Sequence, residues 1–330
     1  MIHSRLLQWA RILPALAILF FLVKRLHNLL TAVEMESITF KPLWLLVSLT
    51  LLLVYLGTLG IPWFFLYQVG IGKSKKTSEV TNLTNKEQNP LLSGWAFFQL
   101  SQLGRYLPGK VGQFVVMFSL SKKFGIQKKG AVLATCFQLA FQCGVGCLIG
   151  FLVLRNTDIA PILHDLLAKL QISGKTALLI GSIAISTLGA SIIFFYRRRI
   201  RETFADLMQQ NFRAMFLTSG ILRLINGYLL LWGLLGTAFF FFIKSLAPVS
   251  ASQLLVVTGS YATAWSIGIL SVITPSGLGV REGILNLLLT SFLPPATATL
   301  IALLSRLWTI SAELAITGIA SGLYWWKLRD

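Results

Sequence analysis

The sequence is poor in charged residues. Only 12% of its 330 residues are Asp, Glu, Lys or Arg, whereas about 25% is typical of soluble domains. Hydrophobic residues make up 55% of the chain, which is more than a water-soluble fold of this size can bury. The composition therefore excludes an ordinary soluble protein and predicts a polytopic membrane protein whose surplus apolar surface faces lipid.

Cysteine and histidine are also scarce. The three cysteines, Cys136, Cys143 and Cys147, lie in one apolar segment and form no Cys-x-x-Cys pair. This pattern excludes a disulfide framework and a cysteine-based metal site. The three histidines lie outside the strongest apolar segments, so an intramembrane haem or His-metal site would have no ligands. We expect no metal and no cofactor.

Acidic residues are few compared with basic ones, with 11 Asp and Glu against 29 Lys and Arg and a formal net charge of +18. Most of the basic excess lies in short loops, where it sets topology and contacts anionic lipid, so we expect no nucleic-acid partner. If the N-terminus is inside, the inside loops carry 17 Lys and Arg and the outside stretches carry 7. The inside loops are 1–11, 70–92, 121–129, 197–213 and 327–330, and the outside stretches are 24–41, 154–176 and 244–252. This bias predicts a plasma (inner) membrane protein with both termini in the cytoplasm.

The apolar segments predict an all-α fold with about six full spans, since a spanning helix needs about 20 largely apolar residues. The expected spans are a first one that begins at Ile12, followed by 43–69, 130–153, 177–196, 215–243 and 297–326. Two further segments, 93–120 and 253–293, are interrupted by proline and glycine, so each is expected to form two helical arms that meet at a break. We interpret them as re-entrant hairpins, although either hairpin could instead cross the membrane fully.

The two breaks resemble each other. Pro108-Gly109-Lys110-Val111-Gly112 and Pro275-Ser276-Gly277-Leu278-Gly279 share the pattern Pro-x-x-aliphatic-Gly at an offset of 167 residues, close to half the chain. Hairpins at matching places that enter from opposite faces predict an inverted repeat with halves of about 1–165 and 166–330. The chain would then be one membrane domain, 1–330, with cytoplasmic loops at 70–92 and 197–213. The predicted helix-break residues are Pro108, Gly109, Gly112, Pro275, Gly277 and Gly279.

Seven charged residues lie in the predicted apolar layer, and five of them are basic. Each costs about 2.5–3.5 kcal/mol on the translocon insertion scale, so an intramembrane charge is a functional hypothesis by default. The surplus cations require an anion, and lipid phosphate is the most available one. The candidate substrate-binding residues are Arg105, Tyr106, Lys110, Arg281, Glu282, Arg306 and Glu313.

Each candidate also has a structural interpretation. Arg105 and Lys110 could satisfy carbonyl groups freed at the break, and Glu282 could cap a helix start beside Arg281. Arg306 and Glu313 are seven residues apart, on one helix face, and could form a strut about 10 Å long. The fifth cation, Arg223, lies only a few residues into its predicted span and could extend to the membrane surface.

The broken segments resemble the signatures of a known family. Residues 104–112, which read GRYLPGKVG, followed by Lys123-Phe124-Gly125-Ile126, resemble the first signature of the lysylphosphatidylglycerol synthase transmembrane-region family, and residues 274–283, TPSGLGVREG, resemble the second. The resemblance covers roughly residues 10–325. It implies a flippase-like fold with lipid-linked substrates, as in the flippase half of aminoacyl-phosphatidylglycerol synthases. One departure is Phe137-Gln138, where many members carry Glu-Arg.

A lipid flippase or scramblase is the function that these features favour, for an anionic phospholipid or a lipid-linked sugar headgroup. We expect neither an ATPase nor an aminoacyl-transferase domain of its own, and therefore a transporter rather than an enzyme. One alternative is an intramembrane lipid-phosphate phosphatase with Ser276 as nucleophile and Glu282 as base. Another is a non-catalytic partner that docks a glycosyltransferase or lipid-synthesis enzyme through the basic run 197–201.

Overall fold

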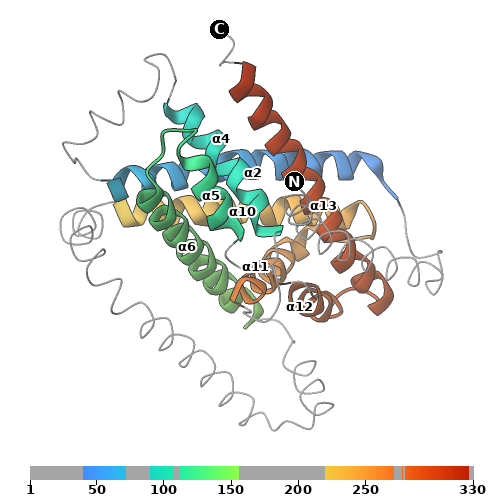
Figure 1. Ribbon diagram of the computed structural model, residues 1–330. Helices are drawn as coiled ribbons and strands as arrows, with labels where there is room; N and C mark the ends of the chain where they lie inside the picture. Colours follow the sequence, from blue (N-terminus) through green and yellow to red (C-terminus); the bar gives the residue numbers. More distant parts are fainter. Residues whose placement is uncertain are drawn as a thin grey trace, which may run out of the picture.

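The described part of the chain is helical. The computed structural model describes residues 40–71, 90–106, 112–155, 220–270, 277 and 279–326. Its helices are α2 (Pro42–Ile71), α4 (Pro90–Gln102), η2 (Leu103–Tyr106), α5 (Gly112–Ser121), α6 (Lys128–Leu154), α10 (Gly220–Lys244), η4 (Ala251–Gln253), α11 (Leu254–Leu270), α12 (Val280–Leu289) and α13 (Pro295–Trp326). No strand occurs among these residues. The predicted all-α class is confirmed for them (Figure 1).

Five of the described helical segments are long and apolar enough to cross a membrane: Pro42–Gln68, Lys128–Val153, Gly220–Lys244, Ala251–Leu270 and Pro295–Tyr324. They confirm a multi-pass membrane protein. Four of them match predicted spans to within a few residues. The fifth, Ala251–Leu270, is the first arm of the broken segment 253–293, so this arm is long enough to cross alone. The expected spans from Ile12 and at 177–196 lie outside the described residues.

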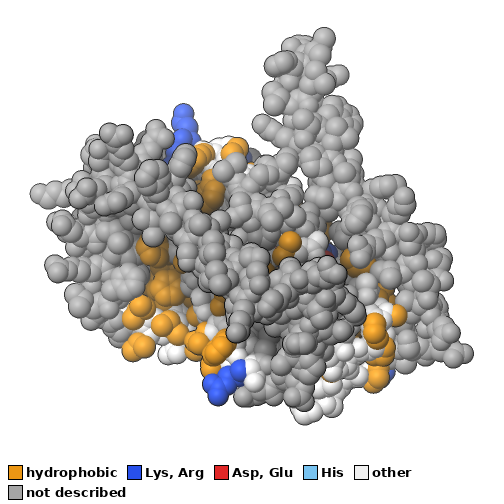
Figure 2. All heavy atoms as spheres, turned by 90° about the horizontal axis from the view of Figure 1, so that it is seen from below, with side chains coloured by type: hydrophobic (Ala, Val, Ile, Leu, Met, Phe, Trp, Pro, Cys, Tyr) orange, Lys and Arg blue, Asp and Glu red, His pale blue; other side chains and the backbone are white. Residues whose placement is uncertain are grey.

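Large hydrophobic side chains on the outside of the molecule are consistent with this membrane setting. Phe151, Leu230 and Leu255 are each at least two-thirds exposed. Figure 2 shows hydrophobic side chains over much of the described surface, with a few Lys and Arg side chains at its margins. In water such a surface would promote aggregation, whereas in a bilayer it contacts acyl chains.

Both broken segments consist of two helices that pack against each other. In the first, α4 continues into η2, which ends at Tyr106, and α5 begins at Gly112. In the second, α11 ends at Leu270 and α12 begins at Val280. The predicted break residues Pro108, Gly109 and Pro275, together with Lys110 and Ser276, lie outside the described residues.

Two glycines at the second break have backbone conformations that other residues rarely adopt. Gly277 has a φ of 69° and Gly279 a φ of 80°, and only glycine enters this region without strain. A Cβ added at Gly277 would lie 2.5 Å from the carbonyl oxygen of Gly268 in α11. The backbone at Gly277 therefore lies directly against α11.

The helices form two sets with the same order along the chain: α2, α4, α5 and α6, then α10, α11, α12 and α13. Within the sets, α4 packs on α5 as α11 packs on α12, and α5 packs on α6 as α12 packs on α13. Between the sets, α6 packs on α11 as α13 packs on α4, and α2 lies along α10 (Figure 1). The contact of α2 with α6 has no equally extensive counterpart between α10 and α13.

Close packing of α10 on α11 depends on Gly236. A Cβ added there would lie 2.2 Å from Oγ1 and 2.4 Å from Cγ2 of Thr258, so no χ1 rotation of the threonine relieves the clash. Gly236→Ala is expected to destabilise the fold by about 1–3 kcal/mol through overpacking. At Gly233 of the same helix nothing lies within 4 Å of an added Cβ, so Gly233→Ala should be neutral or stabilising. Thermal unfolding in detergent compares the two, and equal melting temperatures would contradict this packing.

Candidate functional site

The last described helix, α13, carries two charged side chains that bind different partners. Arg306 forms an ion pair with Glu282 of α12, with 2.5 Å between Nε and Oε1. Glu313 accepts hydrogen bonds from Arg105 Nη2 at 2.9 Å and from the Tyr106 hydroxyl at 2.7 Å, both from η2. The structure therefore does not join Arg306 and Glu313 in a strut along α13. It connects α13 to both broken segments instead.

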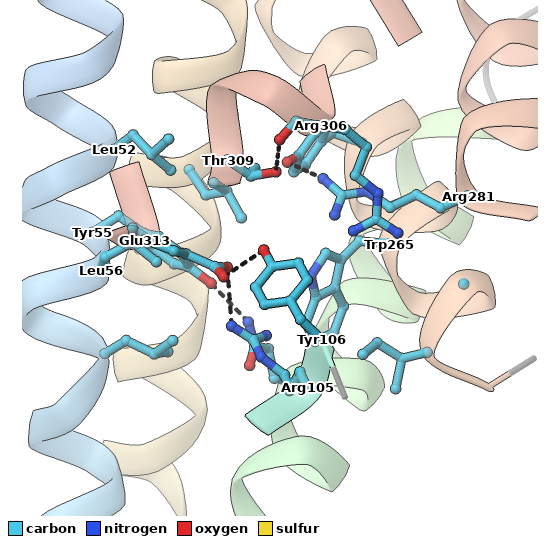
Figure 3. Close-up of a pocket in the computed structure, with 16 residues that line it drawn as sticks. Leu52, Tyr55, Leu56, Arg105, Tyr106, Trp265, Arg281, Arg306, Thr309 and Glu313 are labelled. Atoms are coloured by element: carbon cyan, nitrogen blue, oxygen red, sulfur yellow. Dashed lines mark hydrogen bonds and ion pairs between the residues drawn. The ribbon is translucent and has the colours of Figure 1, made fainter. Parts of the chain in front are cut away.

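Three of these charged residues, Arg105, Arg306 and Glu313, line a small cavity of about 50 Å³. Figure 3 shows Arg281 and Arg306 on one side of it and Arg105 and Glu313 on the opposite side, with Tyr106 between them. The remaining lining is mixed, with hydroxyl, amide and indole groups among aliphatic side chains. The cavity is lined by Leu52, Tyr55, Leu56, Leu59, Arg105, Tyr106, Gln142, Leu235, Tyr261, Trp265, Gly268, Ile269, Arg281, Arg306, Thr309 and Glu313.

Arg281, at the start of α12, has no carboxylate partner among the residues that the structure describes. Its residue is only 6% exposed. One guanidinium nitrogen donates to the Tyr261 hydroxyl, and the guanidinium carbon lies 4.8 Å from the centre of the Tyr261 ring. Its Nε has no hydrogen-bond partner in the described part of the chain. A buried cation that lacks a counter-ion is costly unless something else supplies the negative charge.

Glu282 has two partners, which define its local role. One oxygen accepts the Arg306 Nε–H, and the other accepts the backbone N–H of Gly279 at 2.6 Å. It therefore caps the first turn of α12, where the helix dipole favours an anion. Glu282 does not pair with its sequence neighbour Arg281 in the described structure.

Two of the predicted intramembrane cations are not placed in this cavity. Lys110 lies outside the described residues. Arg223 is exposed near the start of α10, where it lines a separate hydrophobic groove of about 570 Å³ between α10 and α2. Among the described residues, three arginines and Glu313 line the cavity, and Glu282 pairs with Arg306 from outside this lining.

Several neutral residues of the cavity were not predicted. The Gln142 side chain of α6 donates to the Tyr55 hydroxyl of α2 at 2.7 Å, and the Gln142 backbone carbonyl accepts the Trp232 indole N–H at 3.0 Å. Tyr261 of α11 and Thr309 of α13 also line the cavity. The available signal was a polar side chain in the middle of each apolar segment. These residues were missed because the prediction rested on charged side chains and on Tyr106 beside Arg105, and a single neutral polar residue in an apolar segment is common.

The phosphatase alternative has no described nucleophile at this site, because Ser276 lies outside the described residues. No group of three or more His, Cys, Asp or Glu suited to a metal ion occurs within the described ranges. The described arginine and hydroxyl donors of the cavity are groups that can bind an anion.

Five apolar helices and a charged cavity among them define a multi-pass helical membrane protein with an intramembrane polar site. The chain belongs to the lysylphosphatidylglycerol synthase TM region family, whose family model matches residues 8–316. The predicted family is thereby confirmed. Neither a curated protein nor a solved structure gives a significant match to the chain.

Proposed function

We propose that this protein is a flippase-like or scramblase-like transporter that moves a lipid with an anionic headgroup across the plasma membrane. The lipid would be an anionic phospholipid or a lipid-linked sugar. One observation carries the proposal: Arg105, Arg281 and Arg306, from three separate helical segments, line one cavity among helices that are long enough to span the bilayer. Transport rather than catalysis is the role we assign to them.

The cost of these charges supports a functional role. Each intramembrane arginine costs about 2.5–3.5 kcal/mol even on the translocon insertion scale. The planar guanidinium group matches the geometry of phosphate oxygens and remains charged when buried. A phosphate headgroup in the cavity would be neutralised by arginine while its acyl chains stay in the surrounding lipid.

The arrangement of the helices supports an alternating mechanism. The two sets of helices, with their matching contacts, fit the proposed inverted repeat of halves 1–165 and 166–330, with two re-entrant hairpins and both termini in the cytoplasm. In such repeats a polar site lies where the halves meet, and one half moves against the other. Helix α13 forms ion pairs with both broken segments. An anion that displaced Glu313 from Arg105 would break the ion pair between α13 and η2.

The driving force and the partners follow from the same proposal. The described site consists of groups that bind an anion. Transport would therefore follow the concentration gradient of the lipid or be coupled to an ion. Glu282 and Glu313 are the carboxylates that we propose as carriers of a proton. The basic run 197–201, which lies outside the described residues, is the sequence feature to which a glycosyltransferase or lipid-synthesis enzyme that supplies the lipid would dock.

Reconstitution into proteoliposomes tests the proposal. The purified protein should flip fluorescent anionic phospholipid, scored by the access of a quencher, faster than protein-free vesicles do. Arg105→Ala should reduce this rate by about tenfold or more, because it removes the partner of Glu313 and a cation of the cavity. Arg223→Ala is the matched control, since it removes an exposed arginine from a span outside the cavity. Equal rates for the two variants would contradict the site. Release of inorganic phosphate without flipping would favour the phosphatase instead.

A further inference from the structure

The charged cavity lies near the middle of the long helices that surround it. Tyr55 of α2, Gln142 of α6 and Thr309 of α13 line it, and each lies close to the midpoint of its helix. All three helices are long and apolar enough to cross a membrane. A ligand in the cavity would therefore be about 15 Å from either edge of a hydrocarbon layer about 30 Å thick, and it would need a path on each side.

The two ion pairs of α13 lie on opposite sides of this cavity (Figure 3). Arg306 precedes Thr309 in α13 and Glu313 follows it. The two charged residues are seven positions apart, which corresponds to about 10 Å along the axis of a helix. Arg306 binds Glu282 of the second broken segment, whereas Glu313 binds Arg105 of the first. Each ion pair therefore lies between the cavity and a different end of α13.

Close contacts at glycine hold the two arms of each broken segment together. A Cβ added at Gly104 of η2 would lie 2.6 Å from the Cα of Gln113 in α5. A Cβ added at Gly268 of α11 would lie 2.9 Å from the Cβ of Arg281 in α12. Arms packed this closely are expected to move as one unit. The ion pair of each segment with α13 is easier to exchange, because water can solvate its charged groups once they separate.

The two ion pairs are not closed to the same degree. The side chains of Arg306 and Glu282 are 5% and 8% exposed, whereas those of Arg105 and Glu313 are 20% and 14% exposed. The cavity is therefore closed more tightly toward the N-terminal end of α13 than toward its C-terminal end. This difference is expected if the two sides of the cavity can open separately.

We propose that the two ion pairs are the two gates of the cavity. The pair Arg105–Glu313 closes it toward the C-terminal end of α13, and the pair Arg306–Glu282 closes it toward the N-terminal end. In the proposed topology these are the cytoplasmic gate and the outer gate. This inference rests on the proposed function, because gates on both sides of a central site serve a protein that moves its ligand across the membrane.

Thiol labelling from each side of the membrane tests the gates without requiring transport. The reporter is Thr309→Cys in a chain whose three native cysteines are replaced by alanine. The Thr309 hydroxyl donates to carbonyl groups of its own helix, so this change leaves the contacts between helices intact. The reagent is a negatively charged, membrane-impermeant methanethiosulfonate, applied to right-side-out and to inverted membrane vesicles.

The two gate variants should open the cavity to opposite sides. Glu313→Gln should raise the labelling rate about tenfold from the side that holds the C-terminal end of α13, because a neutral amide binds arginine more weakly than a carboxylate does. Glu282→Gln should raise it about tenfold from the other side. Arg223→Gln, outside the cavity, should raise neither rate. Faster labelling from the same side in both gate variants, or no change in either, would overturn the proposal.

A milder variant keeps the test decisive if Glu282→Gln fails to fold. Arg306→Lys keeps the positive charge but loses the planar guanidinium contact, so it should raise labelling about threefold from the same side as Glu282→Gln. No increase in this variant would contradict the second gate. Side-specific labelling without flipping in proteoliposomes would support the gates and contradict the transport proposal. Flipping combined with labelling from one side only would do the reverse.

Discussion

Replacing Arg306 with methionine is expected to destabilise the folded protein by about 3–5 kcal/mol, the usual cost of removing one partner from a buried ion pair. The side chains of Arg306 and Glu282 are only 5% and 8% exposed. Methionine fills a similar volume, so most of the loss would come from the charge left on Glu282. The backbone N–H of Gly279 would remain as its described hydrogen-bond donor, and a neutral donor does not replace a counter-ion.

Thermal unfolding in a fixed detergent measures this effect. The control is Arg223→Met, which makes the same chemical change at an exposed arginine of α10 and should leave the melting temperature nearly unchanged. Adding Glu282→Gln to Arg306→Met removes the charge left without a counter-ion and should recover about 0.5–3 kcal/mol, the range of coupling between contacting residues. If the double variant were less stable than Arg306→Met alone, the described pairing would be wrong.

The helices that face lipid could be predicted from the sequence because the bilayer fixes their length and composition. The predicted span 43–69 corresponds to α2 (Pro42–Ile71), and the predicted span 297–326 corresponds to α13 (Pro295–Trp326). Proline at the first position of both helices marks the start, since its fixed φ suits the first helical turn. The break near Gly277 was signalled in the same way, by residues that cannot continue a helix.

The partners of the charged residues could not be predicted in the same way. The spacing of Arg306 and Glu313 placed them on one helix face, yet each binds a residue from a different part of the chain. Partner choice depends on which helices pack beside α13, and a single sequence does not contain that information. Ion pairs across 24 and 208 residues of sequence are features of tertiary structure rather than of local pattern.

The neutral residues of the cavity could not be predicted for a second reason. Tyr261 binds Arg281, and Gln142 binds Tyr55, but a tyrosine or glutamine within an apolar segment is not rare enough to be recognised as part of a site. Their role depends on neighbours from other helices. The charged residues could be identified as candidates because placing each of them in a bilayer costs a large free energy. This free-energy cost is a better guide to a membrane site than the residue type alone.

Replacing Glu313 with glutamine is expected to slow the proposed lipid transport by about tenfold or more, while binding of the anionic headgroup stays as tight as in the wild type or becomes tighter. Glu313 binds Arg105 at 2.9 Å and the Tyr106 hydroxyl at 2.7 Å, so in the proposed cycle it would compete with the anionic headgroup for Arg105. Without this competitor the cavity gains one net positive charge, and at a few ångströms such a charge is worth about 1 kcal/mol or more even when well screened. The bound lipid would then leave slowly, and release would limit the rate.

Flipping rates in proteoliposomes and binding in detergent, measured on the same preparation, separate this role from a merely structural one. A structural defect would weaken binding and transport together and would lower the melting temperature. Glu313→Asp keeps the charge and should retain more of the transport rate than Glu313→Gln does, because an anion can still reclaim Arg105. If Glu313→Gln transported lipid at the wild-type rate, competition between the carboxylate and the lipid phosphate would not be part of the cycle, and Glu313 would serve only to hold α13 against η2.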